Sequence, residues 1–220
     1  MLLAVVGGFL DAYTFIRHTV FANLQSGNVL LFCVEATARH WHRAVLLLIP
    51  IAAFCIGVLL VEVLGLSRVE RVLRRPLRLV LTLQITLLTA IAALPDDAPE
   101  QITTVTVSFV AALQFSTFTT LRGIPYTTLA ESGNLQKGLA AAHQWLTHKQ
   151  PEAAHRAAQY TAIITGFVGG AVLGAVLTRV LGPPAVAVAA ALLATVLALV
   201  IRETRRLQRR QAAPPRQPGP

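Results

Sequence analysis

The chain has 220 residues, of which 55% are hydrophobic and 13% are charged, and its mean hydropathy is +0.62. Because soluble domains average about 25% charged residues, this composition excludes an ordinary soluble domain and predicts a polytopic helical membrane protein. Eleven of the 19 lysines and arginines lie in two clusters beside apolar segments, residues 68–78 and 202–216, which favours a topology signal and a lipid bilayer partner over nucleic-acid binding.

The first two apolar segments carry polar residues at membrane depth. Residues 1–16 are predicted to form a retained span rather than a signal peptide, because no basic residues precede the apolar run and Asp11 interrupts it. Residues 20–38 contain the triplet Ser26-Gly27-Asn28, which is small, polar and helix-breaking. We expect the chain to turn inside the membrane at this triplet.

Six further apolar segments follow, and the last of them leads into a basic, Pro- and Gln-rich tail. We expect a single transmembrane domain over residues 1–203 and a disordered cytoplasmic tail over residues 204–220. A polar loop is expected at residues 143–156. The six segments are 44–66, 79–94, 101–121, 126–142, 160–180 and 185–201.

The second half of the chain repeats the first. A second triplet, Ser132-Gly133-Asn134, lies 106 residues after the first, and a shift of 113 aligns residues 42–64 with 155–177 at nine identities in 23 ungapped positions. Most of the identities are three residues apart, which places them on one helix face. We therefore predict a duplication, with one repeat at about residues 1–95 and the other at about 101–203.

Charge indicates how the two repeats are oriented. If each triplet segment enters and leaves the membrane on the same side, six spans remain, three in each repeat, and the repeats are inverted. This arrangement puts 15 basic residues inside and four outside, whereas eight full spans would put the basic tail outside. The predicted fold class is an all-α polytopic membrane protein of about six transmembrane helices, built as two inverted three-helix repeats with one broken or re-entrant Ser-Gly-Asn segment each.

The residues around the first triplet resemble the YoaK-like family of bacterial integral membrane proteins. In that family a Gly-x-x-Asp-Ala motif precedes a Phe-containing run ending in Thr-Gly-Asn, with a second such element in the later half. The matching residues here are Gly8-Phe9-Leu10-Asp11-Ala12, Phe21-Ala22-Asn23 and the two triplets, with Ser in place of Thr. The resemblance implies a multi-pass protein of the bacterial inner membrane, described in places as a small permease. The charge count adds that both termini are cytoplasmic.

Polar residues beside the triplets are the candidate substrate or ion pathway. A carboxylate within a span, such as Asp11, by default indicates a proton or cation site, although it could instead bond the broken backbone and only hold the fold. Gln114 matches Asp11 in the second repeat, and Glu131 adjoins the second triplet. Half-helix ends near the midplane would line a cavity between inverted repeats. The candidate residues are Asp11, Asn23, Ser26, Gly27, Asn28, Gln114, Glu131, Ser132, Gly133 and Asn134.

Small residues at four-residue spacing predict a close helix-packing face. Gly166, Gly170 and Gly174 form such a stripe, and Ala53 and Gly57 echo it in the first repeat. The stripe could pack within one chain or across a homodimer, and the sequence leaves both open.

The leading functional hypothesis is a small permease or secondary transporter for an unidentified small solute or ion. A passive channel and a non-transporting scaffold that binds lipid or a partner protein are the alternatives. We expect no enzyme and no cofactor, because the sequence has no phosphate-binding glycine loop and no nucleophile with a base. We also expect no metal site, because His40 and His42 are two residues apart and do not share a helix face.

Overall fold

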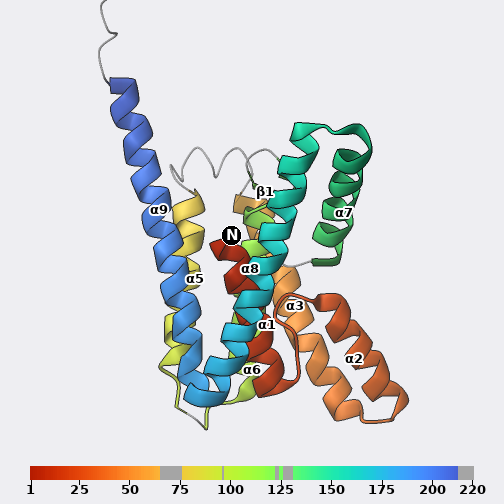
Figure 1. The fold of residues 1–220 in the computed structure, drawn as a ribbon. Helices are drawn as coiled ribbons and strands as arrows, with labels where there is room; N and C mark the ends of the chain where they lie inside the picture. Colours follow the sequence, from red (N-terminus) through yellow and green to blue (C-terminus); the bar gives the residue numbers. More distant parts are fainter. Residues whose placement is uncertain (65–75, 96, 122–123, 126–130, 213–220) are drawn as a thin grey trace, which may run out of the picture.

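The computed structural model describes residues 1–64, 76–95, 97–121, 124–125 and 131–212, and this part of the chain is almost entirely helical (Figure 1). The predicted all-α class is confirmed. A single 3-10 turn, Pro183–Ala185, precedes the last helix. The helices are α1 (Leu2–His18), α2 (Gln25–Thr37), α3 (Trp41–Leu64), α5 (Pro76–Ala92), α6 (Glu100–Thr117), α7 (Glu131–His148), α8 (Pro151–Leu181) and α9 (Val186–Ala212).

Three stretches of the described helices are long and apolar enough to cross a membrane, namely Trp41–Val63, Pro151–Leu181 and Pro183–Arg206. A shorter apolar helix covers Leu77–Ala92. This finding confirms membrane-helix character, while the count of six spans stays a prediction. The hydropathy of α1 and α6 is lowered by Asp11 in one and by Thr, Ser and Gln side chains in the other. Because other helices pack around both, those polar groups face protein rather than lipid.

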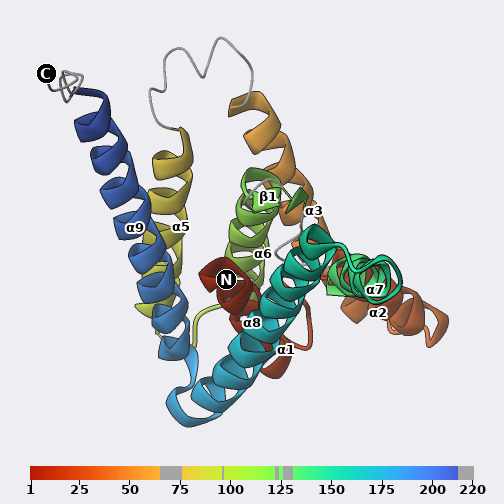
Figure 2. The same cartoon turned by 45° about the horizontal axis from the view of Figure 1, so that its top comes forward.

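Helices α1 and α6 lie in the centre, with α5 and α9 on one flank and α2 and α7 on the other (Figures 1 and 2). The main cluster of buried apolar residues joins α1, α5, α6 and α9, and its largest members include Phe9, Tyr13, Leu88 and Leu193. Lipid tails are as apolar as these side chains, so close van der Waals packing rather than escape from water stabilises the contacts.

The small-residue stripe of α8 lies directly against α1 within the same chain. Gly170 faces the backbone of Val5, Gly174 faces the backbone of Phe9, and Gly166 lies beside Met1 and Ala4. A Cβ atom on Gly174 would stand 2.6 Å from the Phe9 carbonyl oxygen, which is closer than real Cβ atoms come to another heavy atom.

The contact between α3 and α6 also depends on a small residue that lets two helix backbones approach closely. A Cβ on Gly57 would lie 2.6 Å from the Ala112 Cβ and 3.0 Å from the Phe109 carbonyl oxygen. Ala53, one turn before Gly57, is also buried. Small residues therefore let two pairs of backbones approach closely, α8 on α1 and α3 on α6.

Among the described helices, the principal contacts are unchanged when α1, α2, α3 and α5 are exchanged with α6, α7, α8 and α9, in that order. Helix α1 packs on α8 as α6 packs on α3, α2 packs on α3 as α7 packs on α8, and α5 packs on α6 as α9 packs on α1. Each exchanged pair also runs in opposite directions, since α1 descends where α6 ascends, α3 ascends where α8 descends, and α5 descends where α9 ascends (Figure 1).

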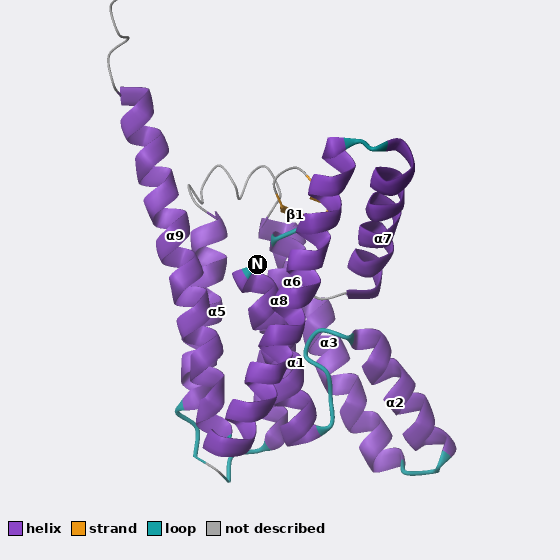
Figure 3. Cartoon of the chain, in the orientation of Figure 1, coloured by secondary structure: helices purple, strands orange, loops and turns teal. Residues whose placement is uncertain are grey.

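The polar loop predicted at residues 143–156 is wrong. Helix α7 continues to His148, α8 begins at Pro151, and only Lys149 and Gln150 connect them (Figure 3). Proline is favoured at the first helical position, because its missing N–H would have no partner there. The segment was predicted to be a loop because it is polar, and polarity does not distinguish an exposed helix from a loop.

The last helix is longer than predicted. Helix α9 extends to Ala212, so the first part of the predicted disordered tail is helical, and residues 213–220 lie outside the described part. Arginine, glutamine and leucine are good helix formers, so the sequence after residue 203 favours continuation of the helix. A two-residue antiparallel pair, β1 (Thr120–Leu121) with β2 (Ile124–Pro125), follows α6.

Candidate functional site

Both triplets lie in the first turn of a helix that begins partway along the bundle. Helix α2 begins at mid-height and descends toward the end where α1 finishes, and α7 begins at mid-height and ascends (Figure 1). The N-terminal ends of the two helices therefore point toward the same level from opposite sides. Before the first triplet the chain makes the turn in the loop of residues 19–24, and not at the triplet as predicted.

Asp11 fixes the loop that leads into α2. One oxygen of its buried carboxylate accepts a hydrogen bond from the backbone N–H of Asn23, at 2.8 Å. The Asn23 side chain in turn donates to the carbonyl oxygen of Gly7, also at 2.8 Å. The loop of residues 19–24 is thereby bound to the middle of α1. This geometry agrees with the structural alternative for Asp11.

Asn28 closes the same loop onto α2. Its side-chain oxygen accepts from the backbone N–H of Phe21, and its Nδ2 donates to the Phe21 carbonyl oxygen, both at 2.8 Å. The second Nδ2 hydrogen is used by Gln25 Oε1 at 2.9 Å. The Asn28 amide is completely buried, and both of its amide hydrogens are already committed within the protein.

Gly27 allows the loop to fold back this tightly. A Cβ at this position would lie 2.8 Å from the ring of Phe21, so a larger residue would displace that side chain. Ser26, by contrast, is exposed. In the first triplet, the buried Asn28 amide holds the loop in place, and the Ser26 hydroxyl is accessible.

The second triplet has the same polar pair at its helix start. Asn134 is completely buried, and its Nδ2 lies 3.5 Å from Glu131 Oε1, which corresponds to the Asn28–Gln25 pair. The other carboxylate oxygen of Glu131 is buried and has no hydrogen-bond partner among the described residues. Ser132 is exposed, and no described atom lies within 4 Å of a Cβ built on Gly133. Residues 126–130, the start of this predicted segment, lie outside the described part.

Gln114 does not join Asp11. It is buried in α6 and donates through Nε2 to the carbonyl oxygen of Leu3, at 2.9 Å, while its own oxygen has no partner among the described residues. Leu3 and Asp11 are eight residues apart on α1, or about 12 Å along the helix axis. Gln114 is the sequence counterpart of Asp11, but it contacts α1 near its N-terminus at Leu3 and not near Asp11.

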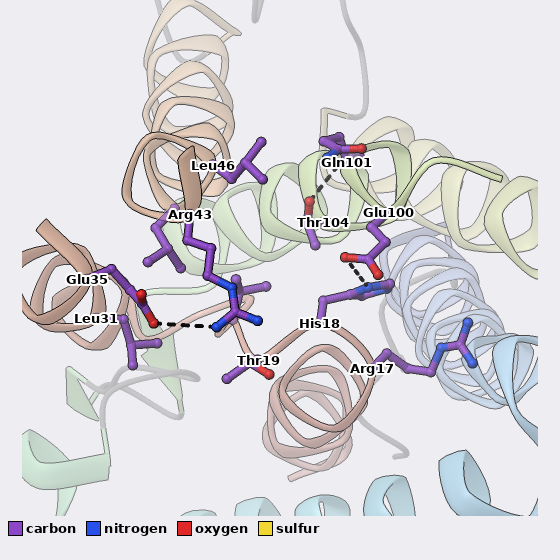
Figure 4. Close-up of a pocket in the computed structure, with 12 residues that line it drawn as sticks. Arg17, His18, Thr19, Leu31, Glu35, Arg43, Leu46, Glu100, Gln101 and Thr104 are labelled. Carbon is purple, nitrogen blue, oxygen red and sulfur yellow. Dashed lines mark hydrogen bonds and ion pairs between the residues drawn. The ribbon is translucent and has the colours of Figure 1, made fainter. Parts of the chain in front are cut away.

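A cavity of about 320 Å³ lies between α1, α2, α3 and α6, at the end of the bundle where α1 finishes (Figure 4). We call it the charged cavity. Glu35 Oε2 lies 2.8 Å from His40 Nδ1, and Glu35 Oε1 lies 4.0 Å from Arg43 Nη1. Across the cavity, His18 Nδ1 lies 3.7 Å from Glu100 Oε2. Its charged and ionisable lining residues are Arg17, His18, Glu35, Arg43 and Glu100.

A second cavity of about 180 Å³ lies beside the charged cavity and shares Arg17, His18 and Glu100 with it. Tyr13 closes part of this second cavity, and its hydroxyl donates to the carbonyl oxygen of Pro183 at 3.1 Å. The His18–Glu100 pair therefore lies where the two cavities adjoin.

The sequence did not predict these cavities, and neither is lined by a candidate pathway residue. His18 and Glu100 are 82 positions apart in the sequence. In the sequence, each of Arg17, Arg43 and Glu100 simply stands next to a predicted apolar segment, where charged residues are common. Only the fold brings these residues together.

Comparison with protein families finds a match to the family described as "Protein of unknown function (DUF1275)" over residues 1–199. The resemblance to an uncharacterised family of membrane proteins is confirmed. No curated protein and no solved structure matches the chain.

Proposed function

We propose that this chain, which belongs to the DUF1275 family, is a small permease of the bacterial inner membrane that moves a small solute between its two half-helices. The observation that carries this proposal is the opposed pair α2 and α7. Two helices that start at mid-depth and leave in opposite directions are the arrangement in which transporters hold solutes between repeats.

The proposal includes two inverted repeats of three spans, each with one re-entrant half-helix. Three observations support it: the sequence duplication, the exchange symmetry of the helix contacts, and the opposite directions of each exchanged pair. With the basic clusters inside, both termini are cytoplasmic and the charged cavity opens to the outside.

The start of a helix carries a partial positive charge of about half an elementary charge. Two such ends directed at one level favour a solute with a negative or strongly dipolar group there. The exposed Ser132 hydroxyl and the buried, unpartnered carboxylate oxygen of Glu131 are the hydrogen-bonding groups that the second half-helix offers, whereas the Asn28 amide holds the first loop in place.

Flux through the reconstituted protein tests the permease proposal. Purified protein in liposomes is compared with protein-free liposomes for uptake of a labelled carboxylic acid, amine, amino acid and neutral sugar. We expect the protein to accelerate at least one of them. Glu131→Gln should lower that flux by roughly tenfold or more, the effect of losing one charge-assisted hydrogen bond. Glu152→Gln, on the exposed first turn of α8, is the matched control and should leave flux unchanged.

The scaffold alternative has one specific observation in its favour, the full internal use of the Asn28 amide. Folded protein that accelerates none of the four solutes would favour it over a permease. Flux that is unaffected by dissipating proton and sodium gradients, and that never concentrates the solute, would favour a passive channel.

A further inference from the structure

The charged cavity has more free hydrogen-bond donors than free acceptors. The Arg43 guanidinium makes no hydrogen bond within the described residues, and its ion pair with Glu35 spans 4.0 Å, the outer limit for such a pair. Glu35 is already bound at 2.8 Å by His40. Arg17 makes no ion pair or hydrogen bond in the part of the chain that the structure describes. Each guanidinium offers five N–H donors, and both side chains are exposed, so most of these donors face solvent at the cavity rather than another described residue.

Neutral donors lie beside these cations. The hydroxyl of Thr19 and the side-chain amide of Gln101 line the cavity, and neither forms a side-chain hydrogen bond with another described residue. On the acceptor side, Glu35 Oε2 is bound by His40, and Glu35 Oε1 lies 4.0 Å from Arg43. The exposed Glu100 carboxylate lies 3.7 Å from His18. These two carboxylates and the Gln101 amide oxygen offer fewer acceptor atoms than the two guanidinium groups offer donors. The complement of this lining is therefore a group that accepts several hydrogen bonds and carries negative charge.

Apart from Thr104, whose hydroxyl donates to the Gln101 carbonyl oxygen, the rest of the lining is apolar. Val20, Leu31, Leu46 and Leu47 form this part of the wall, and Leu31 lies one turn beyond the first triplet on α2. A volume of about 320 Å³ is near the lower end of the range of about 300–1,000 Å³ for small-molecule sites. A charged head with a short hydrocarbon body suits both parts of this surface.

We propose that the charged cavity binds the oxyanion group of a small organic acid, with Arg43 and Arg17 as the cationic contacts and the Val and Leu side chains around the hydrocarbon part. Figure 4 shows Arg43 reaching from α3 into the space between Glu35 and His18. The site rests on the proposed function, because it names the substrate class that a permease would collect at this mouth. Thr19 and Val20 connect the site to the loop that Asp11 holds.

Calorimetric titration of the purified protein with butyrate tests the site. In a neutral detergent without anionic lipid, we expect saturable binding of butyrate and none of butylamine, which has the opposite charge and a similar body. Arg43→Gln should weaken butyrate binding about tenfold or more, and Arg17→Gln should also weaken it. Arg179→Gln is the matched control, since Arg179 is exposed in the last turn of α8, at the same end of the bundle, and does not line the cavity. Equal weakening by Arg179→Gln, or equal binding of butylamine, overturns the site.

A lipid phosphate has the same oxyanion chemistry, so a second titration separates the two sources. The protein is placed in nanodiscs of phosphatidylcholine alone or with phosphatidylglycerol. Butyrate binding that persists in both supports a solute site. Retention of phosphatidylglycerol that depends on Arg43, without butyrate binding in detergent, overturns it in favour of a lipid site.

These experiments distinguish a failure of the oxyanion site from a failure of the permease proposal. If butyrate binds through Arg43 but no solute crosses the liposome membrane, the permease proposal fails and the oxyanion site stands. If the liposomes transport the amine or the sugar and butyrate does not bind, the permease stands and the oxyanion site fails.

Discussion

At the scale of single residues, buried polar side chains around the first triplet each hold a neighbouring segment of backbone in place. Asp11 holds the Asn23 backbone, Asn23 holds Gly7, and Asn28 holds both backbone groups of Phe21. In hydrocarbon an unpaired backbone N–H or C=O cannot turn to water, so each of these bonds lets non-helical backbone exist at this depth. A side chain so engaged contributes to the site by shaping it.

Replacement of Asp11 by Ala should destabilise the protein. The buried N–H of Asn23 would lose its acceptor, which costs about 1–3 kcal/mol, while Asp11→Asn retains an oxygen at that position and should cost less. Thermal unfolding of the detergent-purified protein measures both. Glu62→Ala, an exposed carboxylate on α3 without a hydrogen bond to another described residue, is the control and should be neutral. An Asp11→Ala protein as stable as wild type but inactive in flux would instead place Asp11 in the pathway.

At the scale of helices, α1 and α8 are held together by close van der Waals packing of their backbones, which small residues allow. Gly170 brings the α8 backbone directly onto the α1 backbone at Val5, whereas Gly169 has open space around its Cβ position. The two glycines are neighbours on one helix, and only one of them is needed for packing.

Substitution of these neighbours by Ala should therefore have opposite results. At Gly170 the new methyl meets fixed backbone atoms, which predicts a loss of about 1–3 kcal/mol or failure to assemble. At Gly169 the same methyl meets nothing and removes a poor helix former, so stability should stay level or rise by up to about 1 kcal/mol. Melting temperature and monodispersity on gel filtration measure the difference. Equal losses at both positions would contradict the assigned interface.

The parts of the fold that follow local rules could be predicted from the sequence. The period of Gly166, Gly170 and Gly174 gave the packing face, although only the structure placed it within one chain. A carboxylate within an apolar segment predicted that Asp11 has a specific role. Whether that role is to bind a ligand or the backbone depends on which residues the fold places beside it, and the fold places the Asn23 backbone there. The charged cavity was missed because its residues come from four helices, and no local pattern specifies such a meeting.

At the scale of the whole molecule, opposed directions within the bundle imply that equivalent turns lie on opposite sides of the membrane. Helix α2 ends at Thr37 near the end of the bundle where α1 finishes, and α7 ends at His148 at the other end (Figure 1). Both residues are exposed and are the last of their half-helices. In inverted repeats, one of them must face the periplasm and the other the cytoplasm.

Thiol labelling in intact bacteria tests this orientation. Cys33 and Cys55 are both exposed and are first changed to Ser, to give a cysteine-free background. A membrane-impermeant maleimide should then label Thr37→Cys in intact cells and His148→Cys only after permeabilisation, because the basic clusters belong inside. Labelling of both from outside would show parallel repeats and remove the structural basis of the permease proposal. Labelling of His148→Cys alone in intact cells would keep the inversion and reverse the assigned sides, which would put the charged cavity in the cytoplasm.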